Sequence, residues 1–446
     1  MVRPGALFGT LLLILILFFN PFGLRDASEQ HSEAWLLRML APFYPESARS
    51  DVVVVLIDDQ ALAALHTSWP LRYAEQARFL HQLVGYRPRA IFVDLLYTQR
   101  RQDGGPLDGF RRVLADAREQ GVPLILADYL DPTGQSQLLP ELDRVADTAP
   151  INWSGVGERY PLLIAGQQGP RPTPALRLYQ AHCRVAGCTA EPPAFQAPQL
   201  VRWGYWSDPA MVRYLNLAGC GVRGERSALA QAARLLLADS MRSQQDPDRL
   251  GRPQPCPYTR TLYLNQLRDP RVAEVLRDKL VLLGAQIRGI PDQVQSPVQG
   301  LLPGVYWHAM ALDNLLVQGP HYWRDAPDLW GDFSCSDLLE LLLVLAAGVI
   351  AWRLPAEPRL VGSRWQRWRT HYLFWFGLLG TSALLSSALL ALAADIAPLD
   401  WLGLILSVGL LYAYLGEARV ASWWAGRVAR WAQEHSHKKE IEDAQS

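Results

Sequence analysis

Acidic side chains follow three apolar runs in the first part of the chain. Asp58 and Asp59 end the run VVVVLIDD, Asp94 ends the apolar part of RAIFVDLLYT, and Asp128 follows VPLILA. Because ligands and catalytic groups collect where parallel strands end, we expect these carboxylates to share one rim. Together they could hold Mg²⁺ or Ca²⁺, or act as a general acid and base. We favour a structural alternative, in which Asp58 or Asp59 caps the next helix and Asp94 bonds loop amides.

An arginine and a tryptophan form a second candidate group. In SWPLRY, Trp69, Pro70 and Arg72 predict a turn before a helix, which suits a cation beside an aromatic face. Arg72 could bind an anionic ligand or neutralise the nearby aspartates, and we favour neutralisation. Asp292, in a loop after a later apolar run, is expected near the same rim.

Motifs that would identify an enzyme do not occur. The sequence has no P-loop, GxGxxG, GxSxG or HExxH pattern. His308 in GVYWHAM is a lone histidine, which we interpret as a core or surface residue rather than a ligand. We therefore expect no catalytic activity and no cofactor, and the aspartates alone do not define a metal.

The stretch from Asp51 to Thr98 is the unit that positions these groups. Two apolar runs enclose an amphipathic span of about 25 residues, the pattern of a strand, a crossover helix and a parallel strand. DGFRRVLADAREQG then predicts a helix that ends at Gly121, and VPLILADYL a third buried strand. Alternation of strands and helices predicts an α/β fold, a parallel sheet with helices on both faces.

The pattern weakens between residues 131 and 270, where proline and glycine are frequent. Only ERSALAQAARLLLADSMRSQ predicts a helix there, so we interpret the segment as an insertion on the sheet. Order returns with a helix at 270–278, a strand from Lys279 to Gly284 and a helix from about Val305 to Val317.

Five cysteines include two pairs that are close in sequence. In an oxidising compartment Cys183 could bond Cys188, and Cys220 could bond Cys256. The alternative, unpaired cysteines that act as small apolar residues, has equal weight.

Apolar stretches at both ends of the chain indicate a membrane protein with a globular middle. Half of the 446 residues are hydrophobic and 19% are charged. Residues 1–24 predict an anchor rather than a cleaved signal peptide, and 336–352, 371–394 and 400–416 predict three further transmembrane helices. The expected organisation is an anchor (1–24), a globular domain (25–335) that contains the poorly patterned insertion, three membrane helices (336–416) and a basic tail (417–446).

Arginine distribution predicts the orientation. The connector 353–370 is rich in arginine, whereas the next connector carries Asp395 and Asp400 and no base. Short arginine-rich loops stay in the cytoplasm, which places 25–335 outside and both chain ends inside. The tail predicts an amphipathic helix on membrane lipid or an extension of the last membrane helix. The 43 basic and 43 acidic side chains give a net charge of zero, so the overall charge does not predict nucleic-acid binding.

Two blocks of the chain resemble the type-two CHASE domain, a bacterial sensory extracellular module. The similar features are IDD after the first strand, WP with a following arginine, Asp94, and LLGA at a strand end. The loop from Asp292 to Pro297 and the PGV-x-x-HA helix complete the likeness. Such proteins usually have one anchor, the domain, three membrane helices and a cytoplasmic output domain. Because about 30 residues follow the last predicted span, we expect no output domain in the tail.

The resemblance implies a bacterial inner-membrane sensor whose periplasmic domain relays a ligand or stress signal to a separate partner protein. Its ligand is expected near the rim residues Asp58, Asp59, Trp69, Arg72, Asp94 and Asp292. A non-sensing scaffold subunit of an envelope complex, in which Glu340 contacts a partner, is the first alternative. A metal-dependent enzyme at the aspartates is the second, and homo-oligomers are compatible with either.

Overall fold

Two compact units make up the chain in the computed structural model. The helical unit comprises Met1–Glu33 and Ala326–Ser446, and the α/β unit comprises Ala34–Asp325. The structure describes residues 4–20, 23–152, 159–218, 220–224, 227–239, 256–290, 292–331, 333–353, 372–397, 400, 403–405, 408–409 and 411. The helix α2 (Leu24–Leu40) begins in the helical unit and ends in the α/β unit.

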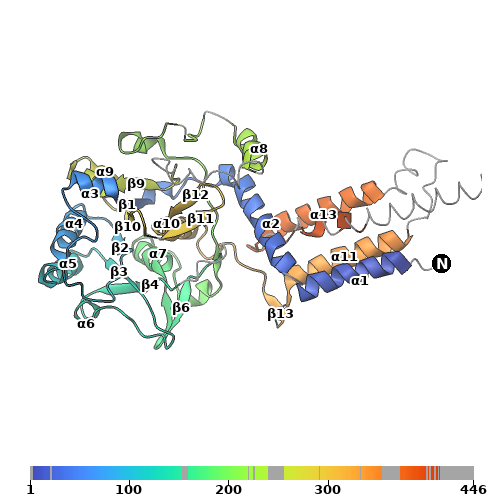
Figure 1. The fold of residues 1–446 in the computed structure, drawn as a ribbon, viewed down its shortest axis with the longest axis horizontal. Coiled ribbons are helices and arrows are strands. Elements are labelled where there is room, and N and C mark those ends of the chain that lie inside the picture. The colour runs from blue at the N-terminus through green and yellow to red at the C-terminus, as the bar shows by residue number, and fades with distance from the viewer. Residues whose placement is uncertain are drawn as a thin grey trace, which may run out of the picture. The chain divides into compact units, whose positions relative to one another are not determined.

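A six-stranded parallel sheet forms the centre of the α/β unit, in the order β4-β3-β2-β10-β1-β9 (Figure 1). The strands are β1 (Val52–Asp58), β2 (Ala90–Val93), β3 (Leu124–Asp128), β4 (Asp147–Pro150), β9 (Arg260–Tyr263) and β10 (Leu280–Gln286). The α/β class and the parallel sheet predicted from the sequence are confirmed. All six strands end at one edge, the carboxyl rim.

The central strands are continuous apolar runs because they are buried on both faces. Every residue from Val52 to Ile57 is at most 1% exposed, and the run is rich in the β-branched residues that suit a strand. Strand β10 lies between β1 and β2. Val281 of β10 pairs with Val53 of β1 on one side and with Ile91 of β2 on the other. The last predicted strand therefore enters the middle of the sheet.

Helices cover both faces. The connections from β1 to β2, β2 to β3 and β9 to β10 all cross the sheet in one direction. The right-handed rule then places their helices on one face: α4 (Tyr73–Gly85), α5 (Asp108–Glu119) and α9 (Val272–Leu276). On the other face α7 (Pro174–Ala186) packs against β2 and α10 (Val305–Gln318) against β1 and β10.

The segment 131–270, expected as an insertion, supplies both edges of the sheet. Strand β4 forms one edge and β9 the other, while α7 packs along α10. Both edge strands have four residues, as β2 does, but their sequences DTAP and RTLY are not the apolar run that makes AIFV of β2 recognisable. Smaller elements complete the segment: α6 (Pro140–Asp143), β5 (Arg159–Tyr160), β6 (Leu163–Gly166), β7 (Gly169–Pro172), β8 (Gln199–Leu200) and α8 (Ala228–Asp239).

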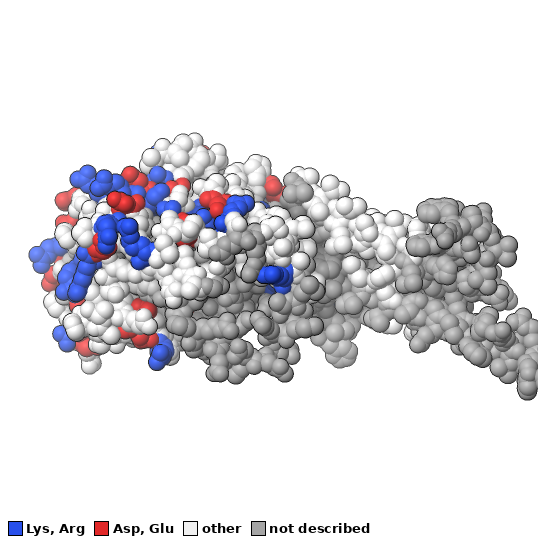
Figure 2. Space-filling model, turned by 90° about the horizontal axis from the view of Figure 1, so that it is seen from above, with Lys and Arg blue, Asp and Glu red and all other residues white. Residues whose placement is uncertain are grey.

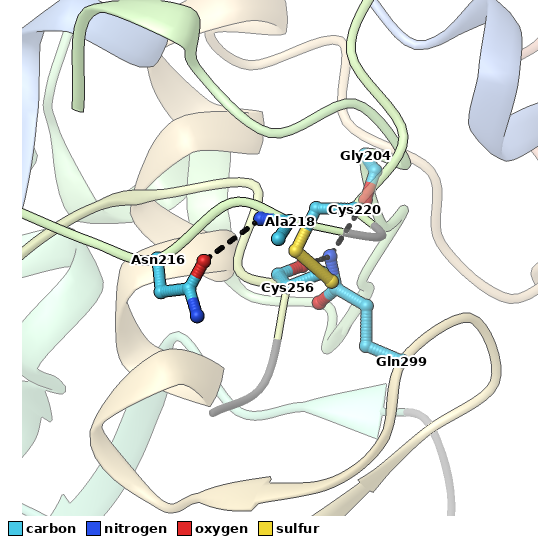
Figure 3. Close-up of a disulfide and its surroundings, with 6 residues drawn as sticks. All are labelled: Gly204, Asn216, Ala218, Cys220, Cys256 and Gln299. Atoms are coloured by element: carbon cyan, nitrogen blue, oxygen red, sulfur yellow. Dashed lines mark hydrogen bonds between the residues drawn. A yellow bond between two sulfur atoms is a disulfide. The ribbon is translucent and has the colours of Figure 1, made fainter. Parts of the chain in front are cut away.

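The remaining short elements of the α/β unit flank the main sheet. They are α3 (Asp59–Ala64), the hairpin of β11 (Gln293–Ser296) and β12 (Gly300–Pro303), and 3-10 turns at Ala41–Phe43, Arg49–Asp51, Pro192–Phe195, Pro209–Arg213 and Leu264–Arg268. Disulfides join Cys183 to Cys188 and Cys220 to Cys256. Gln299, from the β11–β12 turn, donates to the carbonyls of Gly204 and Cys256 beside the second disulfide (Figure 3).

Helices dominate the other unit. They are α1 (Pro4–Phe19), the first part of α2, α11 (Cys335–Arg353) and α13 (Tyr372–Ala393), with a hairpin of β13 (Asp328–Trp330) and β14 (Phe333–Ser334) before α11. Helices α1 and α11 pack closely: a Cβ on Gly348 would lie 2.5 Å from Thr10 Oγ1, so a small residue is needed there.

Among the described residues, α11 alone is long and apolar enough to cross a membrane, and α13 contains the shorter apolar stretch Phe374–Leu390. The four predicted spans therefore remain a prediction. Most of the stretch 400–416, the arginine-rich connector and the whole tail lie outside the described residues.

The two disulfides close loops of different length, which predicts unequal contributions to stability. In the chain-entropy estimate, a bond across 36 residues restricts the unfolded chain by about 4 kcal/mol and one across 5 residues by about 2 kcal/mol. Replacing Cys220 and Cys256 by alanine should lower the unfolding midpoint of the full-length protein more than replacing Cys183 and Cys188. Calorimetry checks this, and an equal or larger loss for the second pair would contradict it.

Candidate functional site

A buried aspartate stands at the middle of the carboxyl rim. Asp94 directly follows β2, and its backbone N–H donates to the carbonyl of Leu283 at 2.8 Å. Its side chain is only 7% exposed, and within the described residues its carboxyl group has no hydrogen-bond partner. Burial, assisted by the charge of Asp292, raises the pKa of Asp94 to about 8. The sequence-based expectation was that loop amides donate hydrogen bonds to this carboxylate. Among the described residues, no amide does so.

A histidine faces Asp94 from α10. The distance from His308 Nε2 to Asp94 Oδ1 is 3.9 Å, and the imidazole packs edge-on against Phe92. Burial lowers the pKa of His308 to about 3, so the ring is neutral at physiological pH.

A tyrosine forms a hydrogen bond with that ring. Tyr160 Oη lies 2.7 Å from His308 Nδ1 and also accepts the N–H of Ala175 at 3.3 Å. Either atom of the Tyr160–His308 pair can be the donor, because a hydroxyl oxygen can accept two hydrogen bonds. When Tyr160 donates to Nδ1, the one proton of the neutral imidazole is on Nε2, the nitrogen that lies 3.9 Å from Asp94 Oδ1.

A second carboxylate lies at the start of α10. Asp292 lies so close to Gly304, the N-cap of α10, that a Cβ on Gly304 would be 2.2 Å from Asp292 Oδ1. The helix N-terminus favours negative charge nearby, although burial raises the pKa of Asp292. Asp94, Tyr160, Asp292 and His308 together are termed the rim cluster. It offers a carboxyl group without a hydrogen-bond partner among the described residues, an imidazole and a second acidic group.

A small apolar cavity lies on the sheet face covered by α4, opposite the face that carries α10. It is lined in part by Leu95, which follows Asp94 in the chain, and by Leu283 and Tyr97. The cavity has room for about one water molecule. It lies across the sheet from His308 and is not part of the rim cluster.

The first two predicted aspartates have other roles. Asp58 Oδ1 accepts the N–H of Ala61 at 2.7 Å and caps α3, as the structural alternative expected. Asp59 is exposed and accepts the N–H of Arg288 at 3.3 Å. Because β10 lies between β1 and β2, Asp58 is separated from Asp94 by a whole strand.

Asp128 also has a structural role. It is buried and binds Arg171 at 2.8 Å and the Ser136 hydroxyl at 2.9 Å. Arg171 thereby attaches the β6–β7 hairpin to the end of β3, and Ser136 attaches the loop that follows β3. Both carboxylate oxygens of Asp128 are therefore occupied.

Trp69 and Arg72 do not join the rim cluster. Trp69, before a cis peptide bond to Pro70, packs partly buried against the core. Arg72 is exposed at the N-cap of α4, where its N–H donates to Glu75 Oε2 at 2.9 Å. No ion pair joins Arg72 to an aspartate of the described part of the chain, so the favoured neutralising role has no contact to support it.

Sequence patterns missed two members of the rim cluster. His308 was set aside as a lone histidine, although it lies at the start of the helix that follows the strand ending in LLGA. A residue one helical turn past a loop at the carboxyl edge of a sheet can face that edge, and this position could have indicated a role for His308. Tyr160 belongs to a two-residue strand in a segment without periodicity, and no pattern indicated it.

Metal and nucleic-acid sites find little support in the described part of the chain. No group of three or more His, Cys, Asp or Glu side chains that could hold a metal occurs among those residues. Figure 2 shows basic and acidic side chains interspersed on the visible face of the α/β unit rather than one basic patch.

Helix α10 connects the rim cluster to the segment after α2. Six residues beyond His308, Asn314 Nδ2 donates to Tyr44 Oη at 3.0 Å, and Tyr44 donates to Asp313 Oδ1 at 2.7 Å. Asp313 is buried, and its pKa is raised to about 7 by that burial. Tyr44 follows the short turn after α2, so one helix reaches from the rim to the lead-in segment.

The helical unit has its own buried polar group. Arg25 pairs with Asp337, while Asp400 accepts the hydroxyl of Ser32 at 2.5 Å. Glu340, expected as a partner contact, is buried and accepts the N–H of Asp400 at 3.0 Å. These residues join α2, α11 and the segment before residue 403 by charge-assisted hydrogen bonds.

The raised pKa of Asp94 predicts a pH-dependent stability difference. Between pH 4 and 8 the folded protein retains a proton on Asp94 that the unfolded chain has lost, so stability falls by up to about 1.4 kcal/mol per pH unit as pH rises. His308 has the opposite slope, present only below about pH 6.5. Asp94→Asn should therefore gain stability relative to the unmodified protein as pH rises from 6.5 to 8.

Urea unfolding of the full-length protein at several pH values measures this difference. Asp103→Asn, at an exposed aspartate, is the control and should show no such trend. A constant difference for Asp94→Asn across that range would refute the assignment.

Comparison with known proteins agrees with the resemblance seen in the sequence. The family model of the CHASE2 domain matches residues 9–350. No curated protein and no solved structure matched the chain. Since the matched range covers most of the 446 residues, the chain belongs to the CHASE2 family of extracellular sensory domains.

Proposed function

We propose that this protein is a membrane-anchored bacterial sensor that binds a small molecule at the rim cluster and relays binding to a separate partner protein. Membership of an extracellular sensory family supports the general role. The observation that carries the specific site is the Asp94 carboxyl group, whose side chain is 7% exposed, which lies 3.9 Å from His308 Nε2 and which has no hydrogen bond from any described residue.

Physical cost is the reason to assign a ligand to Asp94. Burying a carboxyl group without hydrogen bonds is unfavourable by several kcal/mol on transfer scales, and folded proteins usually avoid it. Perturbed carboxyl groups of this kind concentrate at functional sites. A ligand that donates a hydrogen bond or carries a positive charge would satisfy Asp94 and stabilise its ionised form. Binding would then release a proton at neutral pH.

The relay is proposed to run along α10. Its first turn carries His308, and its middle holds Tyr44 through Asp313 and Asn314. Tyr44 is four residues past the end of α2, and Arg38 of α2 donates to the Pro297 carbonyl at 2.7 Å. A shift of α10 on binding would change the support of α2, which continues into the helical unit.

We prefer binding to catalysis for the rim cluster, and sensing to a passive scaffold. His308 is held neutral by burial, and its Nδ1 is engaged by Tyr160, which favours a fixed ring over a proton shuttle. The scaffold hypothesis drew on Glu340 as a contact for another protein, and Glu340 bonds its own chain instead.

Thermal-shift measurements on the full-length protein in lipid nanodiscs test the ligand site. A library of amines, amino acids, organic acids, sugars and divalent cations should contain a compound that raises the unfolding midpoint. Asp94→Asn should lower the affinity for that compound at least tenfold, because it removes the ionisable acceptor.

Asp58→Asn is the matched control, since Asp58 is an aspartate of the carboxyl rim whose pKa is also raised by burial but which caps α3 and lies a whole strand away from Asp94. It should leave the ligand affinity within twofold. Equal affinities in Asp94→Asn and the unmodified protein would exclude the rim cluster, and a library without any stabilising compound would count against small-molecule sensing.

A further inference from the structure

An exposed tryptophan occupies the tip of a hairpin in the helical unit. Strands β13 and β14 pair Asp328 with Ser334 and Trp330 with Phe333, and Gly331 adopts φ +55° in the turn. Trp330 is 87% exposed and its neighbour Leu329 is 54% exposed. Tryptophan is strongly buried on average in folded proteins, so such a pair at one tip requires an explanation.

The hairpin is attached firmly to the first turn of α11. The N–H of Cys335 donates to the carbonyl of Pro327 at 3.1 Å. Both the N–H and the hydroxyl of Ser334 donate to Asp337 Oδ2, at 2.7 and 2.9 Å. Asp337 in turn pairs with Arg25. The tip therefore has a defined position relative to the start of α11.

The length of α11 fixes where that start must be. Its 19 residues rise about 28 Å, close to the roughly 30 Å thickness of the hydrocarbon core. A helix of this length that crosses the membrane has its first residue at the lipid–water interface. The hairpin, joined directly to that residue, lies at the same interface, where tryptophan is the favoured side chain.

We propose that the tip of the β13–β14 hairpin, Leu329 and Trp330, binds the lipid interface and anchors the outer end of α11. The inference rests on α11 crossing the membrane, as the proposed function requires. Exposed Asp328 at the base of the hairpin keeps the contact at headgroup depth, because a carboxylate does not enter hydrocarbon. The anchor would fix the depth of α11 in the membrane and its rotation about its own axis. A signal that moves α11 would act against this contact.

A lipid-quenching experiment on the full-length protein tests the anchor. Cys335, which carries no disulfide, is replaced by serine, and Leu329→Cys is labelled with an environment-sensitive fluorophore in phosphatidylcholine nanodiscs. The label should show blue-shifted emission and be quenched at least twofold more by lipids with a shallow spin label than by those with a deep one. Val212→Cys, at an exposed apolar residue of the α/β unit, should be quenched only by aqueous iodide.

Two substitutions of Trp330 serve as a matched pair in the Leu329→Cys background. Trp330→Asp should cut lipid quenching at least threefold, whereas Trp330→Phe should retain most of it. Iodide quenching equal to that at Val212→Cys would overturn the proposal. So would a label shielded from iodide yet insensitive to lipid quenchers, which would indicate contact with protein or a second copy.

A label in α11 separates failure of the anchor from failure of the membrane assignment. Leu345→Cys, at an exposed position near the middle of α11, should be quenched most by the deep spin label. If that quenching occurs and the hairpin label stays aqueous, only the anchor is wrong. If neither label meets lipid, both the anchor and the spanning role of α11 are refuted.

Discussion

The parallel pairing of β1 with β10 is the constraint on which the α/β unit depends. It joins segments more than 200 residues apart, from Val52 with Leu280 to Asp58 with Gln286, and every residue of β1 from Val52 to Ile57 is buried. Such a pair is stable only when both faces are covered, so α4 and α5 on one side and α7 and α10 on the other are required by it. The pairing also sets the rim. It inserts β10 between the strands that carry Asp58 and Asp94, and it brings α10, which follows β10, to the Asp94 side.

Two buried aspartates show how differently the fold treats the same group. Asp313, in the middle of α10, accepts a hydrogen bond from Tyr44, and the pair closes a fully internal network with Asn314. Asp94, which follows β2 and has a side chain 7% exposed, has no such bond from the described residues. Satisfied buried groups rigidify a core, whereas unsatisfied ones are costly and persist where they serve a function. The contrast between these two aspartates is the basis of the ligand site proposed at the rim and of the coupling proposed at Tyr44.

Sequence patterns predicted the central sheet well because its strands are long and apolar. VVVVLID and LVLLGAQ are recognisable runs, and the apolar spacing of α5 at Phe110, Val113, Leu114 and Ala117 matches the buried face that the structure gives it. The order of the strands in the sheet could not be predicted from local sequence patterns, because the pairing of β1 with β10 joins segments that are far apart in the chain. Strands β4 and β9 were missed because DTAP and RTLY are short and contain polar residues and proline, whereas the equally short β2 is the apolar run AIFV.

The candidate site was predicted only in part, for a related reason. Proximity to strand ends correctly marked Asp94, but it marked Asp58 and Asp128 equally, and only their partners distinguish them: an α3 amide for one and Arg171 for the other. His308 and Tyr160 come from elements distant in sequence, and they meet Asp94 through the packing of α10 on the sheet. Residue type and spacing identify the aspartates at strand ends. Tertiary contacts determine which of these carboxyl groups has no hydrogen-bond partner.

The polar group of the helical unit links α2 to the start of α11. Arg25 and Ser32 of α2 bind Asp337 and Asp400, and Asp337 lies in the first turn of α11. The pair is partly buried, since the side chain of Arg25 is 28% exposed and that of Asp337 is 7% exposed. Charge-assisted hydrogen bonds are stronger than neutral ones, so this group opposes a movement of α2 against the start of α11. In the proposed relay, a shift of α2 would therefore displace α2 and the start of α11 together.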